Sequence, residues 1–112
     1  MQTLNDHVVD GNRYAFDFGC CSAKHGWAQV DTGQDAWYFG TWAHPTRLQI
    51  VCYAEGDVSV QTADSPEEFA AEMRRIKEFH DSTGWKFLGI DAMCNDETEQ
   101  AFKALGLGDL LH

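Results

Sequence analysis

Apolar and polar residues alternate at every second position along much of the first half of the chain. Tyr14, Phe16 and Phe18, for example, alternate with Arg13, Ala15 and Asp17. Alternation of this kind is typical of a strand that buries one face. It predicts a strand-rich region over residues 12–62, with strands near 13–18, 27–31, 36–42, 47–54 and 57–62.

Turn-forming residues separate these predicted strands. Pro45 lies in the segment AHPT, where it fixes one φ angle and cannot donate to a strand ladder. Gly56 lies in the segment EGD, which is a hairpin signal. Because short connections join neighbouring strands in antiparallel order, the pattern predicts an antiparallel meander.

The hydrophobic period changes to that of a helix after residue 64. Ser65 is placed as the N-cap, Pro66 follows it, and Glu68 completes a capping box. Apolar residues follow Phe69 at helical spacing, and Gly84 is expected to end the helix. A helix is therefore predicted at about residues 66–82, with an apolar stripe of Phe69, Met73, Ile76 and Phe79 or His80.

A strand at about 85–90 and a short helix at about 97–105 complete the predicted order. Asp96 and Glu99 are the expected capping pair of this helix, and Gly106 is its expected stop. Strands followed by helices indicate an α+β class. We expect a single domain over residues 1–112: an antiparallel β-meander sheet of about five to six strands, with one long helix and one short C-terminal helix packed on one face.

The charge of the chain excludes some classes of binding partner. The 112 residues carry a net charge of −10, with 18 acids and 8 bases and no basic run. Binding to DNA, RNA or an anionic membrane needs a positive surface, so direct nucleic-acid binding and membrane binding are not expected. No apolar run is long enough to span a bilayer, and the first residues lack a signal-peptide pattern. We therefore expect a cytoplasmic protein.

Two adjacent cysteines, Cys20 and Cys21, lie a few residues before Lys24 and His25. A catalytic thiol needs a nearby cation, histidine or helix N-terminus, so Cys20, Cys21 and His25 are weak catalytic candidates. Free cysteines are also among the residues most often buried, and this structural interpretation is favoured. Cys21 and His25 have a zinc-like spacing but no second ligand pair. No metal and no cofactor are expected.

The segment AWYFGTWAHP carries aromatic side chains at both parities of a strand. One interpretation is a central strand that is buried on both faces or is covered by the N-terminal segment. The other is an exposed interaction surface formed by Trp37, Tyr38, Trp42 and His44, since Trp and Tyr are enriched in interface hot spots. Gly40 would leave a gap on one face, for a ligand or for a crossing aromatic ring.

These observations favour a small acidic binding or accessory protein over an enzyme. An inhibitor-like or immunity-like role toward a basic partner, or toward a nucleic-acid-processing protein, fits the charge. Two alternatives stay open. One is a small enzyme that uses a Cys20/Cys21–His site, and the other is a homodimeric structural protein without catalytic function.

Overall fold

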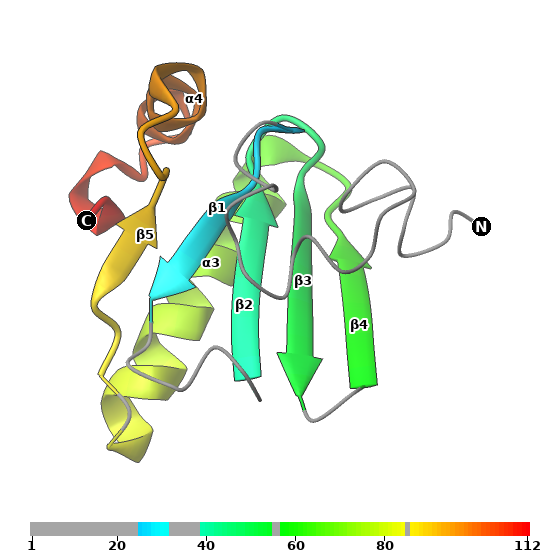
Figure 1. Cartoon of the computed structure of the whole chain (residues 1–112), viewed down its shortest axis with the longest axis vertical. Coiled ribbons are helices and arrows are strands. Elements are labelled where there is room, and N and C mark those ends of the chain that lie inside the picture. Colours follow the sequence, from blue (N-terminus) through cyan, green and yellow to red (C-terminus); the bar gives the residue numbers. More distant parts are fainter. Residues whose placement is uncertain (1–24, 32–38, 55–56, 85) are drawn as a thin grey trace.

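The computed structural model describes residues 25–31, 39–54, 57–84 and 86–112 (Figure 1). The strand expected at 13–18 lies outside these residues. The described part of the chain contains a five-stranded antiparallel sheet, one long helix and one short helix. The predicted α+β class and the antiparallel sheet are confirmed.

The sheet has the strand order β4-β3-β2-β1-β5. Its strands are β1 (Ala28–Asp31), β2 (Phe39–His44), β3 (Gln49–Ala54), β4 (Asp57–Thr62) and β5 (Gly89–Asp91). Strands β1 to β4 follow one another as a meander, and each pairs antiparallel with the next. Strand β5 follows the long helix and pairs antiparallel with β1 at the opposite edge from β4. Strand β5 is shorter than the predicted 85–90, because pairing with β1 begins only at Gly89.

The long helix, α3 (Pro66–Thr83), begins where the sequence predicts and ends one residue beyond the predicted 82. The backbone N–H of Glu68 donates to the Ser65 hydroxyl at 3.1 Å, and the Glu68 carboxylate accepts from the N–H of Asp64 at 3.1 Å. The helix ends at Gly84, whose φ of 90° lies in the left-handed region that glycine tolerates best.

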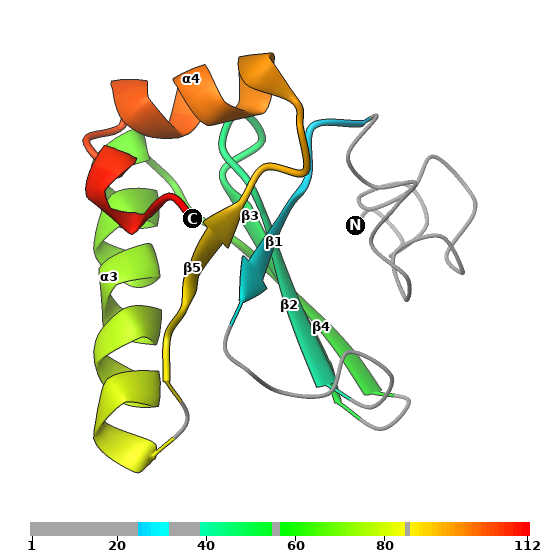
Figure 2. The same ribbon diagram turned by 60° about the vertical axis from the view of Figure 1, so that its left-hand side comes forward.

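The short helix, α4 (Asp96–Ala104), begins one residue earlier than predicted. Its N-cap is Asn95 rather than Asp96, because the Asn95 amide oxygen accepts from the N–H groups of Glu97 and Thr98. A 3₁₀ turn, η2 (Gly108–Leu110), follows it. Figure 2 shows α4 across the end of the sheet at which the β2–β3 turn lies, and α3 alongside the sheet.

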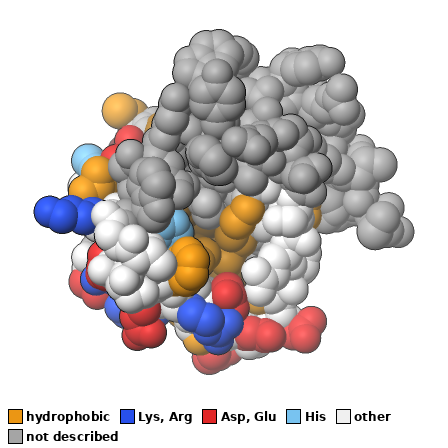
Figure 3. All heavy atoms as spheres, turned by 90° about the horizontal axis from the view of Figure 1, so that it is seen from below, with side chains coloured by type: hydrophobic (Ala, Val, Ile, Leu, Met, Phe, Trp, Pro, Cys, Tyr) orange, Lys and Arg blue, Asp and Glu red, His pale blue; other side chains and the backbone are white. Residues whose placement is uncertain are grey.

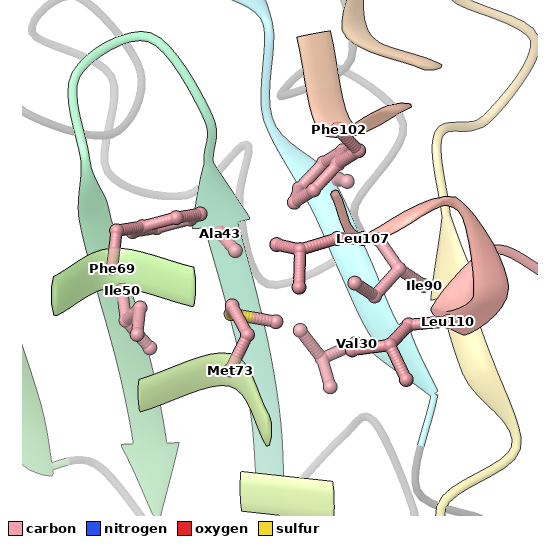
Figure 4. Close-up of a cluster of buried hydrophobic side chains, with 10 residues drawn as sticks. Val30, Ala43, Ile50, Phe69, Met73, Ile90, Phe102, Leu107 and Leu110 are labelled. Atoms are coloured by element: carbon pink, nitrogen blue, oxygen red, sulfur yellow. The ribbon is translucent and has the colours of Figure 1, made fainter. Parts of the chain in front are cut away.

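One hydrophobic cluster joins the sheet to both helices (Figure 4). On the sheet, the cross-strand partners Ala28, Ala43 and Ile50 point to the same face. The cluster contains Ala28, Val30, Ala43, Ile50, Phe69, Met73, Ile90, Phe102, Leu107 and Leu110. The predicted burial of Phe69 and Met73 is thus observed, whereas Phe79 is 61% exposed.

The opposite face of strand β2 carries Trp42, which is fully buried. A Cβ atom built on Gly40 would lie 2.3 Å from the Trp42 ring, so the ring lies directly over this glycine. A side chain at position 40 would have to displace the indole. The gap expected at Gly40 is therefore occupied by a crossing aromatic ring, which was one of its two predicted uses.

Candidate interaction site

A pocket of about 270 Å³ lies where the β2–β3 turn, residues 45–48, meets the first half of α4. The strand side contributes the segment before β1 together with His44. The helix side contributes the N-cap and the first turns of α4. The lining residues are His25, Gly26, His44, Pro45, Thr46, Asn95, Glu97, Thr98 and Ala101.

His44 ties together the elements on the strand side of this pocket. Its Nε2 lies 2.7 Å from the carbonyl oxygen of His25, and its Nδ1 lies 3.1 Å from the backbone N–H of Arg47. Because an N–H can only donate, Nδ1 must be the acceptor and Nε2 carries the ring proton. The Thr46 hydroxyl is also 3.1 Å from Nδ1. Both ring nitrogens therefore hold backbone in place.

The neutral form of His44 is the one that this arrangement favours. The side chain is 6% exposed, and this burial lowers its pKa below the ordinary value of 6.5. The bond to the His25 carbonyl opposes this decrease, whereas the nearby charges of Arg47 and His25 add to it. His44 thus acts as a structural clamp, and its geometry does not present a general base to the pocket.

Close packing around the imidazole fixes its position. The Trp27 ring meets His44 edge to face, with ring centroids 5.1 Å apart, and Trp27 is fully buried. Gly26 has a φ of 92°, and a Cβ atom there would lie 2.7 Å from His44 Nε2. Only glycine can adopt this positive φ and also leave room for the imidazole without strain. The segment before β1 is therefore shaped to receive the histidine.

The starts of both helices are rich in acidic residues. The N–H of Ala63 donates to the carbonyl of Leu48 at 2.8 Å, which places the start of α3 beside the turn. The pocket places the start of α4 beside the same turn. We call the acids of the two helix starts the acidic end: Asp64, Glu67, Glu68, Asp96, Glu97 and Glu99. Arg47 is a base of the turn itself, and Lys103 lies in the last turn of α4, so these six acids exceed the two bases by four charges.

Two acids further along α3, and Asp109 after α4, each pair with a base of α3. Arg75 pairs with Glu72, Lys77 pairs with Asp81 at 2.6 Å, and Arg74 pairs with Asp109 at 3.0 Å. The Arg74 guanidinium holds the pKa of Asp109 below its usual range. Most of the acids without a printed ion pair on the two helices thus lie at their starts, with Glu78 as an exception on α3.

The structure places the predicted site residues in different surroundings. The structure brings His25 and His44 together in one pocket. Trp42 is fully buried, so its side chain is not part of an exposed surface. Four of the candidates, Cys20, Cys21, Trp37 and Tyr38, lie outside the described residues.

Sequence reasoning missed the helix side of the pocket. The sequence indicates only a helix start at Glu97 and Thr98, whereas in the structure both line the pocket together with Thr46. Their local pattern reports a cap and a favourable helix dipole, and it holds no information about a contact with a distant strand turn. No signal in the sequence could have found this pairing.

Among residues 25–31, 39–54, 57–84 and 86–112, no three or more His, Cys, Asp or Glu side chains are grouped so as to hold a metal ion. Within the same ranges, neither helix has the length and apolar character needed to cross a bilayer.

The chain was also compared with known proteins. No family model, curated protein or solved structure matches it. Function must therefore be argued from the geometry of the chain itself.

Proposed function

We propose that this protein acts by binding, and that the acidic end receives a basic partner protein. The observation that carries the proposal is the uneven charge of the two helices. Their starts hold six carboxylates and no base, whereas two acids further along α3, Glu72 and Asp81, each pair with a base of the same helix. If the acidity served solubility alone, an even distribution of charge would be enough.

Favourable interactions with the helix dipoles explain some of the acids at the helix starts, but not all of them. Glu68 serves the helix directly, because its carboxylate accepts from the N–H of Asp64. Glu67, Asp96 and Glu97 are exposed. Glu97 also lines the pocket beside Thr46. A lysine or arginine of a partner could place its apolar stem in the pocket and its charge near this carboxylate.

A capture experiment with matched charge variants tests the proposal. The double variant Glu67→Gln/Glu97→Gln removes one acid from each helix start. The control Glu78→Gln/Asp109→Asn removes the same charge from exposed positions elsewhere. Each tagged protein is incubated with an extract of the organism that encodes it, and captured proteins are identified by mass spectrometry.

A basic protein should be captured by the wild type and the control but not by the double variant. Capture should also weaken as salt is raised from about 0.05 M to 0.5 M, because salt screens opposite charges on an exposed surface. Equal capture by the two double variants would show that total charge, and not the acidic end, attracts the partner. Capture that does not change with salt would contradict the proposal as well.

A further inference from the structure

The pocket between the β2–β3 turn and α4, which we call the upper pocket, has one wall that a single histidine holds in place. Pro45 and Thr46 of the turn line the pocket, and His44 directly precedes them. The N–H of Arg47 donates to His44 Nδ1 at 3.1 Å, and the Thr46 hydroxyl lies 3.1 Å from the same nitrogen. The shape of this wall therefore depends on the lone pair of Nδ1.

Protonation of His44 is incompatible with this arrangement. A second ring proton would occupy the lone pair of Nδ1 and would point at the N–H of Arg47, so that two donors would face each other. The Thr46 hydroxyl can accept from a protonated ring, but a backbone N–H cannot. The ring has little room to turn, since Nε2 is held at 2.7 Å by the His25 carbonyl and the ring packs on the buried Trp27. The bond to Arg47 must therefore break when the ring takes up a proton.

We propose that protonation of His44 is a switch that releases a basic partner from the upper pocket. The inference rests on the function proposed above, because it concerns the same pocket and the same class of partner. With a neutral ring, the turn is held and the carboxylate of Glu97 lines the pocket. With a protonated ring, the turn loses its bond, and a positive charge lies beside the place of the partner's lysine or arginine. Both changes weaken the binding of a cation.

The charged and titratable groups around His44 make the two states exclusive. Within the described ranges, they are His25 before β1, Arg47 in the turn and Glu97 of α4. Burial is the main cause that holds the pKa of His44 below 6.5, and the charges of Arg47 and His25 act in the same direction. Only the carboxylate of Glu97 has the sign that favours a charged ring. A partner's cation that pairs with Glu97 removes this help, so a bound cation and a protonated ring oppose each other.

A second hollow supplies a control for this experiment. It has a volume of about 330 Å³ and lies between α3 and strands β2 and β3. We call it the lower groove, and its lining residues are Thr41, Cys52, Glu72, Arg75, Ile76, Phe79 and His80. Seen from below (Figure 3), hydrophobic side chains gather on the molecule beside charged side chains of both signs. The histidine of the lower groove is not part of the upper pocket.

His80 is a matched control because its ring bonds in the opposite sense. Its Nδ1 lies 2.9 Å from the carbonyl oxygen of Ile76, which can only accept, so Nδ1 carries the ring proton. A second proton then goes to Nε2 and leaves this bond intact. Protonation thus breaks a backbone bond at His44 and preserves one at His80.

Nuclear magnetic resonance of the free full-length chain tests the switch without a partner. The ring signals of His44 and the amide signal of Arg47 are followed from about pH 7.5 to about pH 5. Both should follow one titration curve, and the protection of the Arg47 amide against hydrogen exchange should fall along it. In His44→Asn the side-chain amide oxygen lies near the place of Nδ1 and does not titrate, so the Arg47 signal should lose this step. His80→Asn should keep it.

A cationic peptide tests the consequence for binding. The probe is fluorescently labelled hexalysine, whose charge stays constant between about pH 7.5 and about pH 5. Fluorescence anisotropy gives its dissociation constant at both pH values. The loss of affinity in acid should be at least about threefold larger for the wild type than for His44→Asn, within the usual range of coupling between two sites. His80→Asn should behave as the wild type does. Circular dichroism confirms that each protein is folded at both pH values.

The two proposals fail in different ways. If hexalysine binds the wild type but not Glu67→Gln/Glu97→Gln, and the wild type and His44→Asn lose affinity equally in acid, the switch is wrong and the acidic end stands. An Arg47 amide that does not follow the titration of His44 overturns the switch in the same way. If hexalysine binds Glu67→Gln/Glu97→Gln as well as the wild type, or does not bind at about pH 7.5, both proposals fail together.

Discussion

The two hollows of this molecule flank the same hydrophobic core and yet differ in almost every physical property. The upper pocket is held by a polar clamp at His44 and is bordered by the acidic end. The lower groove is bordered by Phe79 and by acids and bases that pair with each other. Binding at the upper pocket would therefore be driven by electrostatic attraction, and binding at the lower groove by burial of apolar surface.

This difference gives the two surfaces opposite responses to solution conditions. Salt should weaken binding at the acidic end, whereas it would preserve or strengthen an apolar contact at the lower groove. A shift to acid pH should affect the upper pocket through His44, whose nitrogens hold the turn. Both surfaces depend on the fold of the core, so substitutions in the core give the reference against which the two can be compared.

The largest expected effect comes from the core that the two surfaces share. Met73 is fully buried and lies in the cluster with Phe69 and Ala43. Met73→Ala should lower the free energy of unfolding by about 2–5 kcal/mol, because it removes buried methylene groups and leaves a cavity. Urea denaturation measures this loss. A loss of less than about 0.5 kcal/mol would show that α3 packs through another face.

That prediction rests on a feature that the sequence reveals well. The stripe of Phe69 and Met73, the Ser65 cap and the alternation of the strands each arise within a few residues, where helix and strand periods are visible. The fold class, the four consecutive strands within residues 27–62 and the long helix were therefore predictable. The hollows were not, because each joins a helix to strands distant in the sequence.

The site residues show the same division. The aromatic pattern around Trp42 was visible in the sequence, but it could not decide between a buried ring and an exposed one. The structure decides it, because the Trp42 indole lies over Gly40 and is fully buried. Phe79 shows the converse, since helical spacing allowed it in the buried stripe and the structure leaves it exposed. Exposure at the end of a helical stripe depends on how far the sheet extends beneath it.

The next effect tests the clamp of the upper pocket. His44→Leu places an apolar side chain of similar length beside Trp27 and removes both ring nitrogens. The His25 carbonyl and the Arg47 N–H then lose their bonds to the ring, so we expect a loss of about 1–3 kcal/mol in the free energy of unfolding. Thermal and urea denaturation give the value.

A histidine of the lower groove supplies the matched control. His80 Nδ1 lies 2.9 Å from the carbonyl of Ile76, which is also in position to accept the helical N–H of residue 80. His80→Leu should therefore cost less than His44→Leu. If the two variants lose the same stability, the His44 bonds have no special role and the contrast between the two hollows is weaker than we describe.

The pH dependence of stability sharpens this contrast. The pKa of folded His44 lies below its ordinary value of 6.5, so the unfolded chain takes up this proton first as the pH falls. The contribution of His44 to stability is therefore complete above about pH 6.5 and declines as the pH falls toward the folded pKa. Between pH 7.5 and 5.5 the wild type should lose more stability than His44→Leu.

Asp81 and Asp109 do not obscure this window. Hydrogen bonds from Lys77 and Arg74 lower the pKa of folded Asp81 and Asp109 from the ordinary value of 3.8. Their contributions are present above that value and are lost only at more acid pH. Parallel pH curves for the wild type and His44→Leu over this window would contradict the assignment of Nδ1 as an acceptor.

The smallest expected effect separates folding from association at the lower groove. Phe79 is 61% exposed, so in dilute monomer Phe79→Ser should change the free energy of unfolding by no more than about 0.5 kcal/mol. If the homodimer alternative holds and uses this ring, the wild type gains stability at high protein concentration and the variant does not. Denaturation of both proteins at about 1 µM and about 200 µM measures the two quantities separately.

A large loss in dilute solution would mean that Phe79 belongs to the core of the monomer. Equal concentration dependence in both proteins would instead place any self-association elsewhere. With either result the lower groove would lose its exposed ring as an argument for association, while the acidic end would stand on its own evidence.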